Sequence, residues 1–295
     1  MNTKETKIHF YSILKRLYKS KDQDENEEVY YNEIFEIFRK LSNKSKKKRS
    51  YDLKGDKFCL LGNLKSEDGI CYGYIKSARN EFRPNLIDRR TLKERNNPKE
   101  KSEGDVEKTH FLIKEENGEV ILFLEHNHSG ITINNFINYL QNFAKSIDGA
   151  EGKSTGYKII FSVIANNDFL KELEFMQRAK VAEIYMDKQL LGNEALNFSE
   201  KIIQIKQDVK LVVKADLKAD ITKFGVDLFN KFNGKEDVGI NRIRIYGMDQ
   251  NGNNTFVDTN FMGRNDFIKA NLDSDTGETI SEDFFKDLKI ISDSF

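Results

Sequence analysis

The chain has 295 residues, of which 38% are hydrophobic and 33% are charged, and its formal net charge is zero. This length predicts about two domains, and its 22 Phe and 11 Tyr supply enough apolar bulk to exclude wholesale disorder. Two cysteines are too few for a disulfide framework, and no apolar run is long enough for a membrane span or a secretory signal. We therefore expect a cytoplasmic protein in a reducing compartment.

Charge is distributed unevenly along the chain. Residues 1–100 hold 24 Lys and Arg against 16 Asp and Glu, which leaves 24 against 32 for the remainder. The last 25 residues hold two Lys and seven acids. This asymmetry predicts a basic working surface in the first part of the chain and an acidic tail at its end. Solvated charged faces without a partner are the alternative explanation.

Residues 1–148 are predicted to form an N-terminal α+β domain with a mixed sheet and helices. Its first helix is expected at Tyr30–Leu41, where apolar residues recur at helical spacing. The other expected elements are a strand at Ile8–Leu14, a polar loop at Lys19–Glu28, strands at Phe58–Gly62 and Ile70–Ser77, a charge-rich loop at 79–108, and a helix at Asn134–Phe143.

Asn117-Gly118 separates two apolar runs and predicts a β-hairpin at 109–126. Both residues accept the positive φ angles that a type I′ turn requires. Pairing residue 116 with 119 puts Phe111 on one face and places His110 with Glu125 on the other. Because both faces carry apolar residues, we expect the hairpin to be covered on both sides.

Residues 149–156 carry three glycines and are predicted to be an interdomain linker. Residues 157–295 then follow the order β-α-β-β-α-β with one extra strand, which predicts a C-terminal ferredoxin-like sandwich that ends in the acidic tail. The expected strands are Tyr157–Ile164, Arg178–Lys188, Asp208–Ala215, and a hairpin of Asn241–Asp249 with Asn254–Phe261; the expected helices are Asn167–Gln177 and Asp220–Phe232, with a further helix considered at Glu282–Ile290.

The linker matches Gly-x-Ser-x-Gly at Gly152–Gly156. A nucleophile elbow needs a strand before the serine and a helix after it, whereas here a helix is expected before and a strand after. A phosphate-binding loop would need glycine at position 147, which is Ile147. We therefore interpret this match as part of the linker.

The histidines His126 and His128 share one face of a strand, a spacing that metals can use. His110 falls on the opposite face in the predicted register, so the pattern favours a structural or surface role. No metal site and no cofactor is predicted.

The triplet Asp216-Leu217-Lys218 follows a predicted strand, as in many nucleases, but Asp-Leu-Lys also occurs at Asp52 and Asp287. Metal-dependent cleavage needs further acids that converge from elsewhere. A metal-dependent nuclease is therefore the enzymatic alternative, and no catalytic residue is assigned.

Cationic side chains from several segments are the candidate nucleic-acid contacts. Those on the predicted strands of the second domain alternate with apolar residues, so they would gather on the open face of a ferredoxin-like sheet. A further group is a basic run in the first domain. Several such groups bind phosphates without reading sequence. The alternatives to a nucleic-acid surface are a solvent-exposed sheet face without a partner and a dimer interface. The candidates are Lys44, Lys46, Lys47, Lys48, Arg49, Arg178, Lys180, Lys210, Lys214, Arg242 and Arg244.

The order of several segments resembles the RexA family of phage-exclusion proteins, known from phage lambda. The resemblance rests on Phe10-Tyr11, Asp56–Leu61, the hairpin 109–126, Arg178–Glu183 and Val209–Ile221. The first half also resembles uncharacterised bacterial proteins of phage-defence neighbourhoods. The resemblance implies a homodimer that binds DNA without sequence preference and helps to stop phage growth. It supplies no catalytic residues.

These observations favour a non-enzymatic, sequence-nonspecific DNA-binding protein of phage defence, with a membrane protein or a phage protein as a further partner. The alternatives are a metal-dependent nuclease effector and an adaptor that senses a phage protein. Affinity that falls with salt, cleavage that requires Mg²⁺, and capture of a phage protein would distinguish the three hypotheses.

Overall fold

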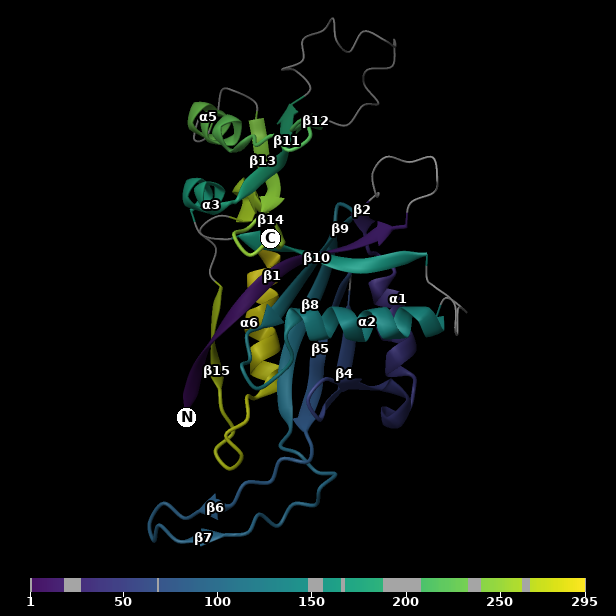
Figure 1. Cartoon of the computed structure of the whole chain (residues 1–295), viewed down its shortest axis with the longest axis vertical. Coiled ribbons are helices and arrows are strands. Elements are labelled where there is room, and N and C mark those ends of the chain that lie inside the picture. Colours follow the sequence, from purple (N-terminus) through teal and green to yellow (C-terminus); the bar gives the residue numbers. More distant parts are fainter. Residues whose placement is uncertain are drawn as a thin grey trace, which may run out of the picture. The chain divides into compact units, whose positions relative to one another are not determined.

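A computed structural model describes residues 2–18, 28–67, 69–147, 156–165, 168–187, 208–232, 240–261 and 266–294 (Figure 1). Its helices and β-strands confirm the predicted mixed α+β content. The Cα positions group into two compact units. The first unit comprises Met1–Phe161 with Phe267–Asp293, and the second comprises Ser162–Asp266 with the last two residues.

An antiparallel sheet in the order β3-β4-β5-β8-β9-β1 forms the framework of the first unit. Two further strands, β2 and β15, pair with the long strand β1. In chain order the elements are β1 (Thr3–Leu17), β2 (Glu28–Tyr30), α1 (Ile34–Ser42), the 3₁₀ helix η1 (Lys46–Arg49), β3 (Ser50–Leu53), β4 (Lys57–Glu67), β5 (Ile70–Arg79), β6 (Leu86–Ile87), β7 (Glu94–Arg95), β8 (Glu107–Glu116), β9 (Glu119–Glu125), α2 (Ile133–Ile147), β15 (Phe267–Asn271) and α6 (Ser281–Asp293).

The predicted hairpin is confirmed as β8 and β9. Residue Glu116 pairs with Glu119, and the two turn residues have positive φ, 53° at Asn117 and 81° at Gly118. These angles fit the type I′ turn that the Asn-Gly pair favours. The register therefore follows from the turn, and with it the face on which each side chain of the hairpin lies.

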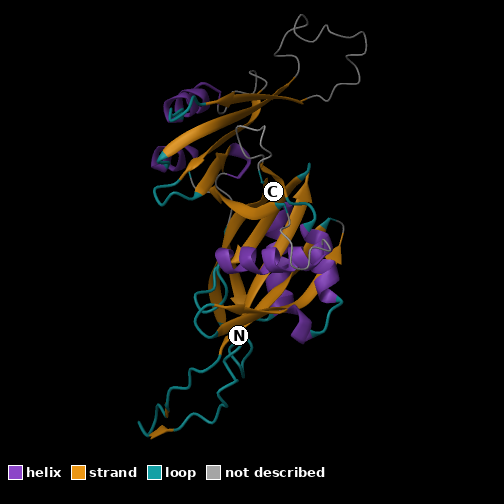
Figure 2. Cartoon of the chain, turned by 45° about the vertical axis from the view of Figure 1, so that its right-hand side comes forward, coloured by secondary structure: helices purple, strands orange, loops and turns teal. Residues whose placement is uncertain are grey.

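Helices cover both faces of this sheet, as the two apolar faces of the hairpin predicted. On one face the Phe111 ring contacts Phe38 of α1 and Phe136 of α2, with centroids 5.0 and 5.4 Å apart. On the other face its neighbour His110 stacks on Phe284 of α6 at 4.5 Å. Figure 1 shows α2 crossing the strands, and Figure 2 shows helices on both sides of them.

The C-terminal segment belongs to the first unit, whereas the sequence placed it in the second domain as an acidic tail. Strand β15 pairs with β1 from Thr3↔Asn271 to Lys7↔Phe267, and α6 buries Phe284, Leu288 and Ile291. The acids occupy the exposed side of this helix, so the composition of the segment concealed its apolar stripe.

Residues 80–106, which we call the arm, connect β5 and β8. Strands β6 and β7 pair within it, with Leu86 opposite Arg95, and Figures 1 and 2 show it as a long extension. Large apolar side chains on the arm are exposed, among them Phe82, Ile87 and Leu92. The sequence predicted a charge-rich loop here, but not its apolar surface.

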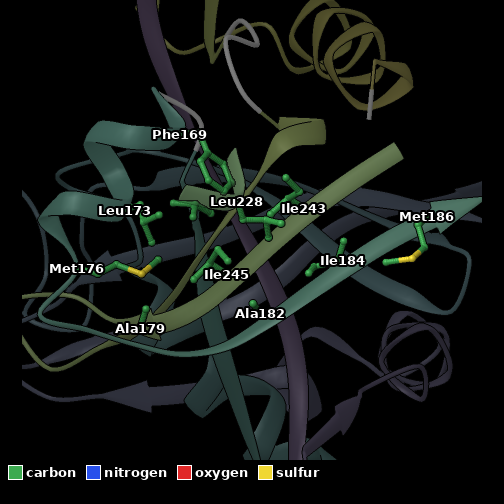
Figure 3. Close-up of a cluster of buried hydrophobic side chains, with 11 residues drawn as sticks. Phe169, Leu173, Met176, Ala179, Ala182, Ile184, Met186, Leu228, Ile243 and Ile245 are labelled. Carbon is green, nitrogen blue, oxygen red and sulfur yellow. The ribbon is translucent and has the colours of Figure 1, made fainter. Parts of the chain in front are cut away.

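The second unit has a sheet in the order β12-β11-β13-β14-β10. Helices α3 and α5 contribute Phe169, Leu173 and Leu228 to a cluster with Ile184 and Ile243 of the strands (Figure 3). The elements are β10 (Tyr157–Ala165, which begins in the first unit), α3 (Phe169–Phe175), β11 (Arg178–Asp187), β12 (Asp208–Lys214), α5 (Thr222–Phe232), β13 (Ile240–Met248), β14 (Asn254–Asp258) and η5 (Thr259–Phe261).

The ferredoxin-like arrangement is not confirmed, although the order of strands and helices along the chain matches. In that fold the first strand lies between the third and the fourth, whereas β10 pairs in parallel with the extra strand β14, and β13 lies between β11 and β14. The predicted hairpin around Asn251-Gly252 is confirmed, since Met248 pairs with Asn254. The predicted linker lies outside the described residues except for Gly156.

Candidate functional site

Arg242 and Arg244 of β13 contact one carboxylate, Asp258 on the neighbouring strand β14. Arg244 Nε is 2.5 Å from Asp258 Oδ2, and an Arg242 terminal nitrogen is 2.7 Å from it. Arg244 and Asp258 are both fully buried. Burial raises the pKa of Asp258, and the Arg244 charge acts in the opposite direction. Arg244 is therefore part of the interior, which corrects the prediction that it points outward into solvent.

The other predicted cations of the second unit do not form an open cationic face. Lys210 pairs with Glu183 at 3.0 Å, and Arg178 Nε donates to the Ala219 carbonyl at 2.7 Å. Lys180 is half-buried, while Lys214 is exposed. The alternation of side chains was predicted correctly. However, Glu183 and Asp258 lie on the same sheet face as the cations and form ion pairs with several of them.

The basic run of the first unit is arranged differently. Between Ile37 and Tyr51 the chain carries seven Lys and Arg and no acid; we call this stretch the basic segment. Lys46, Lys47 and Lys48 lie on η1 with exposed side chains. The sequence predicted this run as a nucleic-acid contact, without a defined conformation.

Hydrogen bonds fix the backbone of η1. The Tyr139 hydroxyl of α2 donates to the Arg49 carbonyl at 2.8 Å, and the Ser50 hydroxyl donates to the Lys47 carbonyl at 2.9 Å. Lys44 is half-buried, with its ammonium 5.9 Å from the Phe143 ring centre. The segment therefore holds three exposed lysines on a fixed turn.

A cavity of about 560 Å³ lies at the base of the arm. Lys54, Lys57 and Arg79 contribute cationic groups to its lining, Asp105 and Glu107 contribute carboxylates, and Phe82 contributes an aromatic ring. The Arg79 guanidinium lies 5.1 Å from the Phe82 ring centre. Burial lowers the pKa of Lys57, whose ammonium donates to the Ser129 carbonyl at 2.8 Å.

The histidine pair is exposed, in agreement with a surface role. The rings of His126 and His128 lie 4.5 Å apart, and His9 stacks on His126 at 4.8 Å. Across the described part of the chain, no group of three or more His, Cys, Asp or Glu side chains is arranged to hold a metal ion.

In the nuclease-like triplet Asp216-Leu217-Lys218, the Leu217 side chain is 92% exposed and Lys218 has a φ of 65°.

A polar cluster that sequence reasoning missed lies between the sheet and α6. His110 Nδ1 is 2.7 Å from Glu125 Oε2, and His110 Nε2 is 2.8 Å from Ser281 Oγ. The hairpin register had already put His110 and Glu125 on one face. Ser281 lies 171 residues further along, in the segment taken for a tail, so no sequence pattern pointed to the third member.

Comparison with known proteins finds no family model and no curated protein that matches this chain. None of the helices in the described ranges is long and apolar enough to cross a membrane. The resemblance to the RexA family therefore stays a prediction.

Proposed function

We propose that this protein binds nucleic acid without reading its sequence, through the basic segment of the first unit, and that it acts in phage defence. The observation that carries the binding proposal is the display of Lys46, Lys47 and Lys48 on a fixed, exposed turn within a stretch that has no acid. Phosphates exchange their condensed counterions for such groups, which makes binding favourable and independent of base sequence.

The arm and the cavity at its base support the same function. Residues 83–95 of the arm hold five Lys and Arg against two acids. Arginine presents a planar fork that suits phosphate oxygens. The exposed Phe82 ring beside Arg79 offers a surface on which an unpaired base can stack. The proposal therefore includes single-stranded as well as duplex nucleic acid.

The second unit has a smaller part in this proposal than the sequence suggested. Its exposed Lys214 can add a contact, but Arg242, Arg244 and Lys210 are engaged with carboxylates. We propose that the two units are separate domains, because the second has a hydrophobic cluster of its own. Homodimer formation, a membrane or phage-protein partner, and the role in phage defence are predictions of the RexA resemblance.

The direct test is a binding titration across salt concentrations. Fluorescence anisotropy with a labelled duplex and a labelled single strand, at about 50 to 200 mM salt, should give a linear fall of log affinity with log salt. Absence of binding at the lowest salt would discard the proposal. Degradation of the strand that requires Mg²⁺ would favour the nuclease, and capture of a phage protein without nucleic-acid binding would favour the adaptor.

A further inference from the structure

Three polar side chains of the first unit form one hydrogen-bonded chain. His110 on β8 joins Glu125 on β9 through Nδ1 and Ser281 in the first turn of α6 through Nε2. We propose that Ser281, His110 and Glu125 are a Ser–His–Glu triad that hydrolyses small polar carboxylic esters. The three residues lie outside the basic segment and the arm, so the triad can be changed without replacing a residue of the nucleic-acid surface proposed above.

The hydrogen bonds determine where the imidazole carries its proton. Glu125 Oε2 accepts from the His110 backbone N–H at 2.8 Å and lies 2.7 Å from His110 Nδ1. A carboxylate only accepts, so in the neutral ring the proton is on Nδ1 and the lone pair of Nε2 faces the Ser281 hydroxyl. This is the arrangement in which an imidazole acts as general base for a serine.

Packing holds the imidazole in this orientation. The His110 ring is fully buried and stacks on Phe284, with Phe285 and Tyr74 against its other sides at 5.3 and 5.8 Å. The elements around the ring thus present Glu125 from β9, Tyr74 from β5 and the Ser281 hydroxyl from α6. A general base held by rigid neighbours loses little entropy when it reacts.

Ser281 stands where an oxyanion can be stabilised. It is half-buried and begins α6, and the Phe284 N–H donates to the Ile280 carbonyl as the helix starts. The first N–H groups of a helix have no acceptor within it, and they lie at the positive end of the helix dipole. Those of Ser281 and Glu282 are therefore suited to hold the oxygen that becomes negative when a carbonyl is attacked.

A cavity of about 360 Å³ lies beside Glu125, the one member of the triad in its lining. Thr279, two residues before Ser281, also lines it, and its charged residues are Lys4 and Lys108 with the acids Asp105, Glu107 and Glu278. Thr6, which precedes the Glu125 partner Ile8 by two residues on β1, has a buried hydroxyl without a hydrogen-bond partner in the described part of the protein. The small size and charged lining of the cavity favour a short, polar ester.

The proposed reaction conserves atoms and protons. Ser281 Oγ bonds to the ester carbonyl carbon and passes its proton to His110 Nε2; the carbon–oxygen bond to the alcohol then breaks, and the alcohol leaves with that proton. Water attacks the resulting acyl-serine and gives a proton to Nε2, the acid departs, and Ser281 Oγ recovers the proton. Glu125 takes up no proton in either step; it is the positioning residue that orients the ring through Nδ1.

A purely structural cluster would make the same hydrogen bonds, so the reactivity of Ser281 decides between the two explanations. The first experiment treats the full chain with a fluorescent fluorophosphonate, whose phosphorus bonds to an activated serine oxygen as fluoride leaves. Wild type should be labelled, Ser281→Ala should not, and Ser274→Ala should be labelled like wild type. Ser274 is the matched control because it is an exposed serine in the loop before α6.

The second experiment needs no substrate and uses Ser281→Cys. If His110 is a base, the new thiol forms a thiolate–imidazolium pair and reacts with iodoacetamide at about pH 6, where an ordinary thiol is slow. The background is low, because Cys59 and Cys71 are buried and burial raises the pKa of each to about 12. The rate should fall at least about tenfold when His110→Gln is added.

Glu125→Gln in the Ser281→Cys background tests the positioning role. Loss of the carboxylate disfavours the imidazolium, so the pH at which alkylation becomes rapid should rise by about one unit. Thermal unfolding of each variant shows whether it folds. If the variant with His110→Gln does not fold, the alkylation rate of Ser281→Cys alone still tests the proposal. Labelling lost in Ser281→Ala, or rapid alkylation at low pH, supports the triad. Unlabelled wild type together with alkylation of Ser281→Cys at the rate of a free thiol overturns it.

Discussion

The cations of the two units differ in burial and in ion pairing. In the second unit Arg244 is fully buried and shares the Asp258 carboxylate with Arg242, whereas the lysines of η1 in the first unit face solvent in a stretch with no acid. In the sequence both segments are simply rich in Lys and Arg. The difference arises because strand neighbours bring carboxylates to the same sheet face, while a surface turn has only its own sequence around it.

A cation contributes to a binding surface only when it is not already paired with a carboxylate of the protein. A buried guanidinium needs a counter-charge, so it stabilises the fold in its paired form and is unavailable to phosphates. Exposed lysines cost little to keep in water, and their charge remains available to a polyanion.

Removal of Asp258 should have the largest effect. Asp258→Ala deprives the buried Arg244 of its counter-charge, and we expect a loss of about 3–5 kcal/mol in the unfolding free energy of the second unit. Urea unfolding followed by circular dichroism measures it. The control Asp227→Ala, at an exposed position on α5, should change stability by less than about 0.5 kcal/mol. Equal effects would mean that the buried pairs do not support this unit.

Replacement of the η1 lysines should weaken binding and leave stability unchanged. If each of Lys46, Lys47 and Lys48 contacts one phosphate, changing all three to Ala should lower affinity about a hundredfold at about 0.15 M salt and reduce the salt slope by about 2.7. Anisotropy titrations on two unrelated duplexes measure both quantities. The matched control changes three other exposed lysines to Ala: Lys145, Lys223 and Lys269. A similar loss in that control would show that only total charge matters.

Asp220 tests a carboxylate that accepts hydrogen bonds mainly from backbone N–H groups and a threonine hydroxyl. It accepts from the Ala179 N–H at 2.8 Å and from Thr222 at the start of α5, so Asp220→Ala should cost about 1 kcal/mol. Burial raises the pKa of Asp220, but these hydrogen bonds prevail and lower it below 3.8. Its contribution is therefore present above that pH and is lost as the pH falls through the lower folded value. Urea unfolding of wild type and variant should converge from about pH 7 to about pH 3; a constant difference would contradict this.

The smallest effect is expected at Lys210. Its pair with Glu183 is partly exposed, and such pairs contribute less than about 1 kcal/mol. Lys210→Ala should therefore change neither urea stability by more than that nor nucleic-acid affinity by more than about twofold. A large loss of affinity in this variant would return the second unit to the binding surface and remove the contrast between the units.

Local features of the fold could be predicted closely from the sequence. Asn117-Gly118 determined the hairpin turn and its register, and the two apolar faces of the hairpin indicated cover on both sides, which α1, α2 and α6 provide. These inferences hold because turn geometry and side-chain alternation depend on neighbouring residues alone. Four of the five strands predicted for the second unit agree with the structure to within one residue at each end, whereas β14 ends at Asp258, three residues before the predicted end.

The candidate sites could not be predicted in the same way. The sequence showed that Arg244 alternates with Ile243 and Ile245, but not that Asp258 would be its neighbour across β13 and β14. It showed His110 beside Glu125, but not Ser281, because the acids of α6 concealed a helix that packs on the sheet.

Sequence alone determined the mixed α+β content, the two hairpins and the exposed basic run at Lys46–Lys48, since these depend on short-range sterics and composition. Tertiary structure alone decided which cations are paired, where the C-terminal strand and helix dock, and which three polar groups meet at α6. Those outcomes depend on contacts between residues far apart in the chain, and no local pattern specifies such contacts.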